Sequence, residues 1–260
     1  MILRTIVRDC LLLNWAVPTE ALPPLPLPLR YEIHAIDGES RVLVTALFLF
    51  HEGVRLAAVP MVRFSYPQFS FALSVLDGDG VPSMLLRRVL VPTWVFPAAK
   101  LLGREPVATA RLAFDRPSAD LGAESWSWTV EDGARLRVEA CQGPPAEASR
   151  NGDFFQQVEY FRRRRRSYFR TGKGFRRVAT EIPEVDPWPM SARVAEGALL
   201  EACLPLGGSP WPQVESAFLF PDLPLRYDLS LKPRLRLQPG VPQPAASRRQ
   251  GLEHCSRRAE

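Results

Sequence analysis

Residues 63–103 read RFSYPQFSFALSVLDGDGVPSMLLRRVLVPTWVFPAAKLLG, and this stretch decides the fold of the chain. Apolar and polar residues alternate over residues 64–76, a pattern typical of a strand with one buried face. The alternation of the aromatic residues changes phase across Pro67, which predicts a bulge or kink there. The Asp-Gly-Asp-Gly sequence at residues 77–80 then predicts a sharp turn.

The second half of the same stretch predicts a short helix and an extended segment. Ser83 is a suitable N-cap for a helix over residues 84–91, and Pro92 would end that helix. Phe96-Pro97 then predicts an extended segment that reaches Lys100. We expect sheet before this stretch, and sheet with helix after it.

Strand patterns dominate the rest of the chain. The predicted strands cover residues 11–17, 31–50 as a hairpin around Asp37-Gly38, 54–63 after a turn at Glu52-Gly53, 107–115, 125–130, 135–141, 175–182, 218–220 and 226–231. One longer helix is predicted from an N-cap at Asp153 to about Thr171, with Gly172 as its stop. The pattern predicts an α+β protein that is mostly antiparallel sheet.

Composition is ordinary for a soluble globular protein of 260 residues, with 46% hydrophobic and 23% charged residues. The 26 prolines favour strands joined by rigid loops over long helices. We expect a single domain over residues 1–238 and a disordered tail over residues 239–260, where the sequence loses its periodicity. No apolar run approaches the roughly 20 residues needed to span a bilayer.

Cysteine and histidine usage predicts neither a metal nor a cofactor. The four cysteines are scattered without metal-type spacing, which is typical of reduced thiols in a cytoplasmic protein. The histidines His34, His51 and His254 are far apart, and we interpret the first two as solvated strand positions. A serine nucleophile in a Gly-x-Ser-x-Gly turn is also missing from the sequence.

Five consecutive arginines at residues 162–166 lie inside the longer predicted helix. Five positions at about 100° each sweep more than a full turn, so they cannot all face solvent. We expect Arg162 or Arg165 to lie near the apolar side, where it needs a carboxylate such as Glu159 or Asp153, or an anionic ligand. Aromatic residues around the run leave open an interaction module that binds polyanions, although the net charge of +5 is small for a nucleic-acid binder.

Several motifs occur in an order that resembles one bacterial family. They are CLLLNWAVPTEAL at residues 10–22, RFSYPQF at 63–69, VPSMLLRRVL at 81–90, VFPAAKLLG at 95–103 and DPWP at 186–189. Together they resemble the uncharacterised family called domain of unknown function 2071, a relative of the acetoacetate decarboxylase-like superfamily. The resemblance implies a twisted, partly closed antiparallel β-barrel with a few packed helices and an interior cavity.

The resemblance does not carry the decarboxylase chemistry to this chain. In that enzyme family two lysines directly follow an aromatic-Pro dipeptide, and one forms a Schiff base while the other lowers its pKa. The corresponding positions here are Ala98 and Ala99, and the family's acidic residue would fall near Ser70 or Phe71. Lys100, one residue beyond the pair, leaves open a Schiff-base enzyme of decarboxylase or aldolase type.

The leading functional prediction is a protein that binds a small apolar or carboxylate-bearing molecule in the cavity, without decarboxylase chemistry. The expected lining residues are Arg63, Tyr66, Phe69, Trp94, Phe96 and Trp188. Arg162 and Arg165 are the candidate anion contacts. The two alternatives are the Lys100 enzyme and the polyanion-binding module, and the sequence does not indicate an oligomeric state.

Overall fold

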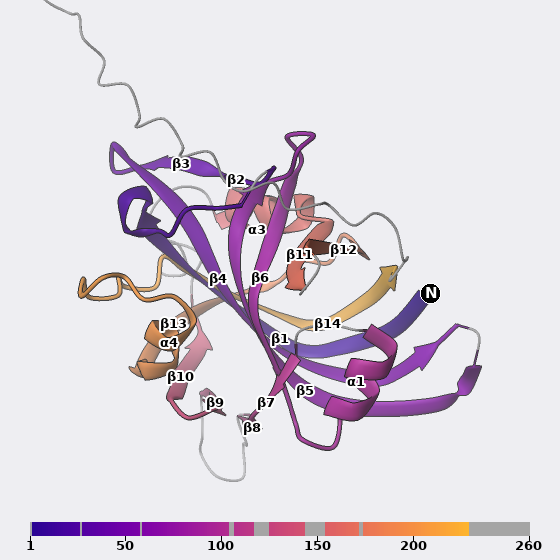
Figure 1. The fold of residues 1–260 in the computed structure, drawn as a ribbon. Helices are drawn as coiled ribbons and strands as arrows, with labels where there is room; N and C mark the ends of the chain where they lie inside the picture. Colours follow the sequence, from indigo (N-terminus) through magenta and orange to yellow (C-terminus); the bar gives the residue numbers. More distant parts are fainter. Residues whose placement is uncertain are drawn as a thin grey trace, which may run out of the picture.

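The computed structural model describes residues 2–26, 28–57, 59–103, 107–116, 125–143, 154–171 and 174–228 (Figure 1). The strands are β1 Ile2–Pro18, β2 Arg30–Tyr31, β3 Ile33–Ile36, β4 Glu39–Leu56, β5 Val59–Leu76, β6 Pro82–Val91, β7 Val107–Thr109, β8 Arg111–Asp115, β9 Trp126–Glu131, β10 Arg135–Gln142, β11 Arg166–Thr171, β12 Gly174–Glu181, β13 Trp188–Glu196 and β14 Ser216–Asp228. The helices are the 3₁₀ turn η1 Thr19–Ala21, α1 Phe96–Gly103, α3 Phe154–Arg163 and α4 Ala198–Cys203. The predicted tail over residues 239–260 lies outside the described residues, as do Asp153 and Gly172.

The strands form one mostly antiparallel sheet, as the sequence predicts. Its order is β1-β4-β5-β6-β11-β12-β14-β13-β10-β9-β8, and an additional pairing joins β1 to β14. Seven of these strands therefore close a ring of pairings, β1-β4-β5-β6-β11-β12-β14 and back to β1. The pairings of β6 with β11 and with β7 are parallel. No helix among the described residues is long and apolar enough to cross a membrane.

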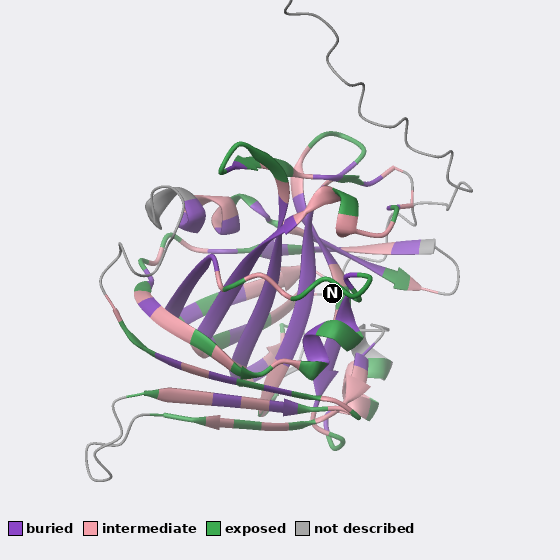
Figure 2. Cartoon of the chain, turned by 90° about the vertical axis from the view of Figure 1, so that its left-hand side faces the viewer, coloured by how far each residue is buried: buried purple, intermediate pink, exposed green. Residues whose placement is uncertain are grey.

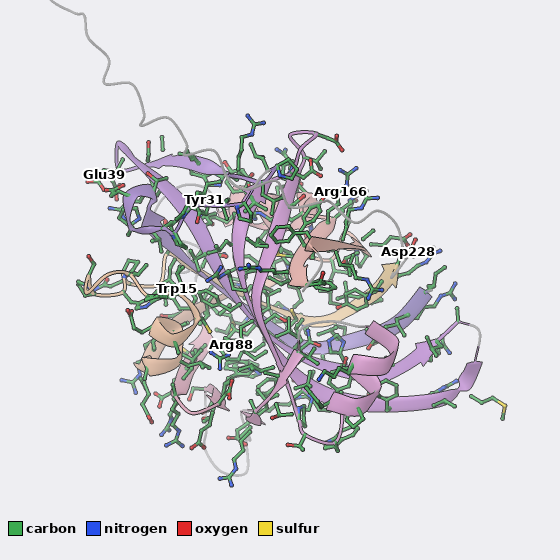
Figure 3. All side chains as sticks on the ribbon, viewed as in Figure 1. Trp15, Tyr31, Glu39, Arg88, Arg166 and Asp228 are labelled. Atoms are coloured by element: carbon green, nitrogen blue, oxygen red, sulfur yellow. The ribbon has the colours of Figure 1, made fainter. Side chains whose placement is uncertain are left out.

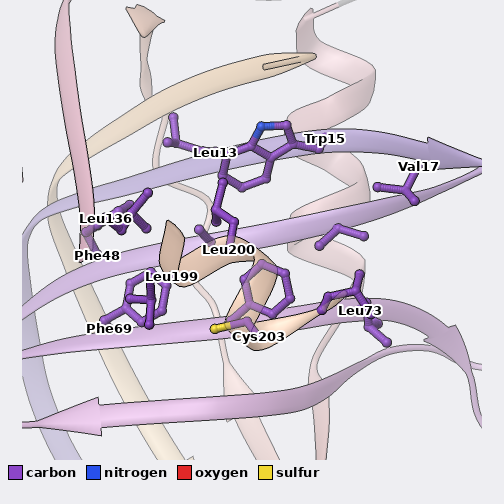
Figure 4. Close-up of a cluster of buried hydrophobic side chains, with 14 of the residues drawn as sticks. Leu13, Trp15, Val17, Phe48, Phe69, Leu73, Leu136, Leu199, Leu200 and Cys203 are labelled. Atoms are coloured by element: carbon purple, nitrogen blue, oxygen red, sulfur yellow. The ribbon is translucent and has the colours of Figure 1, made fainter. Parts of the chain in front are cut away.

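The two faces of the long strands belong to two different cores, because successive side chains point to opposite faces. On β5, Phe69, Phe71 and Leu73 belong to the larger core, which also takes residues from β9, β10 and α4 (Figure 4). Ala72, on the opposite face of β5, belongs to a smaller core that includes Val158 and Phe161 of α3 and is called the α3 core below. Figure 2 shows that the middle parts of the long strands are mostly buried.

Residues 84–91 were predicted as a helix, and this prediction was wrong. They lie on β6, which pairs with β5 on one side and with β11 on the other. Met84 and Leu85 are both buried although they point to opposite faces. A continuous apolar run buried on both faces is typical of a central strand and cannot be told from a helix by periodicity alone.

The extended segment predicted at Phe96-Pro97 is instead the start of helix α1. The amide of Ala99 donates to the Val95 carbonyl oxygen at 3.0 Å, which closes the first helical turn. Pro97 stands near the helix start, where its missing N–H costs no hydrogen bond. The segment that resembles the decarboxylase lysine region is therefore helical in this chain.

Two details predicted around β4 and β5 were also wrong. The chain does not turn at Glu52-Gly53. β4 runs on to Leu56, and Gly53, with a φ of +60°, lies in a register shift between His51 and Val54. No bulge occurs at Pro67, because the register of β5 with β4 runs evenly through it. The aromatic residues before and after Pro67 simply occupy the two faces of one continuous strand.

The longer helix was predicted to reach about Thr171, and only its first part is helical. Helix α3 ends at Arg163, and the chain continues as strand β11 from Arg166. Tyr168 and Phe169 are adjacent and both buried, which a strand covered on both faces permits. The closing strands predicted at 218–220 and 226–231 belong, as far as Asp228, to a single strand, β14, and residues 229–231 lie outside the described residues.

Candidate functional site

A cavity of about 110 Å³ lies against α1 and the ring of strands. Each of the seven ring strands contributes to its lining, so the ring surrounds it. The lining residues are Leu3, Thr5, His51, Val54, Phe64, Tyr66, Gln68, Leu86, Val89, Val95, Ala98, Ala99, Ser167, Val178, Thr180 and Tyr227. The face of the sheet that carries them is called the cavity face below, and it is the face that carries the α3 core further along β1, β5 and β14.

Helix α1 covers one side of the cavity with small side chains. Val95, just before the helix, is buried, and Ala98 and Ala99 follow within its first turns. Phe96 does not line the cavity but packs against the neighbouring cluster that contains Val89. Two methyl groups at this position leave space that larger side chains would fill.

His51 is the polar centre of the cavity. It lies on β4 just before the register shift, and it is 2% exposed. Its ring stands 4.9 Å from that of Tyr66 and 6.1 Å from that of Tyr227, measured between centroids. Neither ring nitrogen has a hydrogen-bond partner among the described residues. A buried polar group without a partner costs about 1–3 kcal/mol, so the two nitrogens mark a place where a ligand can bind.

Burial lowers the pKa of His51 to about 4, and a weak side-chain hydrogen-bonding interaction with Gln68, whose geometry falls outside the limits of an ordinary hydrogen bond, opposes part of that shift. The imidazole is therefore neutral near pH 7, with one nitrogen that donates and one that accepts. Among the described residues that line the cavity, none is Asp, Glu, Lys or Arg. The cavity thus offers apolar walls and a neutral hydrogen-bonding group.

Two other polar side chains of the lining are partly satisfied within the protein. Thr5 Oγ1 donates to the Glu52 carbonyl oxygen at 3.1 Å. The Gln68 amide donates to Ser70 Oγ at 3.0 Å. His51 differs from these two because both of its ring nitrogens are buried without an ordinary hydrogen bond to the described residues.

The six expected lining residues are spread over several regions, and Tyr66 is the member of the set that lines the cavity. Phe69 points to the opposite face of β5, into the larger core. Trp94 is 61% exposed, and Trp188 is 40% exposed beside Trp126. Arg63 lines a groove outside the cavity.

Lys100 does not reach the cavity. It is exposed on α1, and its Nζ lies 4.7 Å from the centroid of the Phe96 ring. In a helix, adjacent residues lie about 100° apart, so Lys100 and Ala99 point in different directions. The amine thus lies outside the space in which the cavity would hold a molecule.

The arginine run is divided between α3 and β11, and its alternate members form ion pairs. Arg162 bonds to Glu159 at 2.8 Å, as expected, and also to Asp186 at 3.1 Å. Arg165 is exposed, so of the two expected candidates Arg162 is the one that lies near the apolar side. Arg164 is the buried member: its side chain is 4% exposed and pairs with Glu32 at 2.9 Å. The helix ends at Arg163, before the strand begins at Arg166. Because of this change, the fully buried arginine of the run is Arg164, which the helical pattern did not predict.

Arg166, labelled in Figure 3, joins β11 to the acidic turn after β5. Its guanidinium bonds to the Asp77 carboxylate at 2.6 Å, and the Tyr168 hydroxyl donates to the same oxygen at 3.0 Å. Burial alone would raise the pKa of Asp77, but these bonds and those from the amides of Val81 and Asp79 lower it below its ordinary value. The arrangement holds the turn in place.

Sequence reasoning missed His51, which we interpreted as a solvated strand position. The available signal was the apolar run VLVTALFLF at residues 42–50, which leads into it without a break. Such a run indicates a strand buried on both faces, and its next residue is buried as well. Within the described part of the chain, no group of three His, Cys, Asp or Glu side chains is placed to hold a metal ion.

Comparison with solved structures supports the fold. The enduracididine biosynthesis enzyme MppR complexed with pyruvate has a TM-score of 0.58 and 15% identity, covering 87% of this chain and 88% of that one. An acetoacetate decarboxylase-like enzyme from Sphingomonas wittichii RW1 has a TM-score of 0.58 and 14% identity, covering 91% and 94%. MppR complexed with the condensation product of pyruvate and imidazole 4-carboxaldehyde has a TM-score of 0.54 and 15% identity, covering 87% and 86%. At these identities the likeness shows the fold alone.

No curated protein matches the chain in sequence. A family model does match it, over residues 5–216, which is most of its length. Because of that match, the chain belongs to the family of domain of unknown function 2071, described as an uncharacterized conserved protein.

Proposed function

We propose that this protein binds a small, neutral, mainly apolar molecule in the cavity under α1, and that the surrounding ring of strands acts as a partly closed barrel. One observation carries the proposal. His51 is buried at the cavity with both ring nitrogens unpartnered among the described residues. A ligand that gives and accepts a hydrogen bond there would remove the cost of that burial.

The size of the cavity limits the ligand to about one ring. An engineered protein cavity of about 150 Å³ binds benzene, and this cavity of about 110 Å³ is of the same order. Rings of Phe64, Tyr66 and Tyr227 in the lining suit a flat apolar body. The ligand therefore combines a compact apolar part with a single amide-like or hydroxyl-like group.

The charges around the cavity favour a neutral ligand over the carboxylate that the sequence left open. A buried carboxylate needs a cation or several hydrogen-bond donors. The described lining offers no lysine or arginine, and the low pKa of His51, about 4, opposes its becoming a cation. A carboxylate would bind here only if it held a proton itself or forced one onto His51.

A Schiff-base enzyme is not favoured by this geometry. By the resemblance to acetoacetate decarboxylase, Ala98 and Ala99 occupy the positions of the lysine pair, and both line the cavity. They present methyl groups where that chemistry needs an amine. Lys100 carries its amine on the exposed side of α1. We accordingly propose binding without decarboxylase chemistry, in the cytoplasm, where the free cysteines Cys10, Cys141 and Cys203 would stay reduced.

Benzamide and benzoate test the proposal, because they share a shape and differ in charge. Calorimetry and thermal shift should show that benzamide binds and raises the Tm, whereas benzoate does neither near pH 7. His51→Leu should weaken benzamide binding about tenfold or more, which is the loss of one hydrogen bond to a buried group. His34→Leu, a histidine outside the cavity lining, is the matched control and should bind as the wild type does.

Two outcomes would overturn the proposal. One is benzoate binding as tightly as benzamide, and the other is benzamide binding that His51→Leu leaves unchanged. Pyruvate, which the MppR structure contains, serves as a third probe. Pyruvate binding that depends on His51 would show that the site takes carboxylates after all.

A further inference from the structure

A row of arginines crosses three neighbouring strands on the face opposite the cavity. Arg4 of β1 is the direct cross-strand partner of Arg55 on β4 and of Arg226 on β14. The row ends at Glu181 of β12, which is opposite Arg226. Figure 1 shows the three arginine-bearing strands side by side, and Asp228, labelled in Figure 3, marks this end of β14. Like charges directly opposite one another destabilise a sheet, so a fold that keeps this row needs another reason for it.

The nearby carboxylates do not neutralise the row. Glu181 pairs with Arg226 at 3.3 Å, at the edge of the row. Glu52 pairs with Arg8 at 2.7 Å, and Asp222 pairs with Arg8 as well. Among the described residues, Arg4 and Arg55 have no carboxylate partner. The same holds for Arg63 of β5.

These arginines share one groove of about 770 Å³, which Arg4, Arg55, Arg63 and Arg226 all line. The lining also includes the carboxylates Glu52 and Glu181, which the four arginines outnumber, and the apolar residues Ile6, Pro183 and Pro224. The Nε atom of Arg226 is buried and has no hydrogen-bond partner within the described part of the chain. The groove therefore combines unpaired positive charge with an unsatisfied guanidinium donor.

The groove and the cavity are separate sites on the two faces of the same strands. On β1, Leu3 lines the cavity, Thr5 borders both the cavity and the groove, and Arg4 between them points to the other face. On β14, Tyr227 lines the cavity and Arg226 lines the groove. A failure of ligand binding in the cavity would leave the case for the groove unchanged.

We propose that this groove binds a compact polyphosphate. Neighbouring strands lie about 4.8 Å apart, so the row from Arg55 to Arg226 spans about 10 Å at the backbone. A single phosphate is too small to contact the whole row, whereas a chain of two or three phosphates extends along it. Guanidinium groups bind phosphate oxygens through paired, charge-assisted hydrogen bonds, which explains the use of arginine at each position.

Tripolyphosphate binding, measured by calorimetry on the full chain, tests this proposal. The double variant Arg4→Gln/Arg55→Gln should bind tripolyphosphate at least about tenfold more weakly than the wild type, because two charge-assisted contacts are lost. The control Arg87→Gln/Arg111→Gln removes two exposed arginines outside the groove and should change the affinity less than about twofold. Inorganic monophosphate should bind the wild type more weakly than tripolyphosphate does.

The Tm of the variants, measured without any anion, provides a second test. Removing like charges that face each other should leave the Tm of Arg4→Gln/Arg55→Gln equal to or above that of the wild type. A fall in binding together with a preserved Tm would support the site. The proposal is overturned if tripolyphosphate does not bind, if both double variants lose affinity equally, or if monophosphate binds as tightly.

Discussion

The cavity face of the sheet is packed at one end and hollow at the other. Under α3, the rings of Phe161, Phe218 and Phe220 lie 5.6 to 6.4 Å apart between centroids and fill the space. Under α1, Ala98 and Ala99 leave a cavity of about 110 Å³. The two ends differ mainly in the size of the side chains that each helix presents to the sheet.

The packed end and the hollow end contribute differently to stability and to binding. A filled core gains from every buried methylene, at about 0.8 kcal/mol each. The hollow end gives up that gain and also holds His51 without partners among the described residues. A protein selected for stability alone would place larger, apolar side chains there. We infer that the packed end holds the fold together and the hollow end binds the ligand.

Emptying the packed end should have the largest effect on stability. Phe161→Ala removes a buried ring of α3 and should lower the free energy of unfolding by about 3–5 kcal/mol. Phe64→Ala, at the hollow end, removes a half-buried ring and should cost about 1–2 kcal/mol, because the ring already borders open space. Urea denaturation measures both. Equal losses would mean that the two ends are packed alike.

Lowering the pH should destabilise the hollow end through His51. Its pKa is about 4 in the folded protein and 6.5 ordinarily, so the unfolded chain binds the proton first as the pH falls. The free energy of unfolding should therefore drop between pH 6.5 and pH 4, by up to about 3 kcal/mol from this group. His51→Leu should lack this part of the pH dependence. Parallel stability curves for the two proteins would contradict the account.

Filling the hollow end should abolish binding. Ala99→Leu places a larger side chain in the cavity and should reduce benzamide affinity by about tenfold or more, since the volume is taken. Lys100→Leu introduces the same residue at the next, exposed position of α1 and is the matched control. Calorimetry should show wild-type affinity for the control. Benzamide bound equally well by Ala99→Leu would place the site elsewhere.

The smallest effect is expected at Lys100. Lys100→Ala should leave benzamide binding unchanged, because the amine lies outside the cavity. Borohydride reduction in the presence of pyruvate, followed by mass spectrometry, should leave wild type and variant without a covalent adduct. An adduct on the wild type that is lost in Lys100→Ala would restore the Schiff-base alternative.

Local sequence patterns predicted the sheet well, because alternation and turn residues are local signals. The hairpin at Asp37-Gly38 and the turn at residues 77–80 follow from such signals, and both occur. The errors at residues 84–91 and at α1 have one physical cause. Whether a short apolar run becomes strand or helix depends on neighbours far away in the sequence, here β11 on one side and the ring on the other.

The site was less predictable than the fold. The arginines that stand together in the sequence are divided between helix and strand, and Arg162, Arg164 and Arg166 are paired with carboxylates. The arginines that gather in the groove come from four separate strands, so no local pattern reveals them. His51 and Tyr227 likewise meet through the ring closure, which the sequence indicated only through the family resemblance.

Nuclear magnetic resonance of the protein with ¹⁵N-labelled histidine tests the central claim most directly. The His51 ring should show the signals of a neutral imidazole near pH 7 and titrate with a pKa of about 4. Benzamide should shift the His51 ring nitrogens and leave those of His34 in place. Benzamide binding that leaves the His51 ring unperturbed, or a His51 ring that is already protonated near pH 7, would contradict the account.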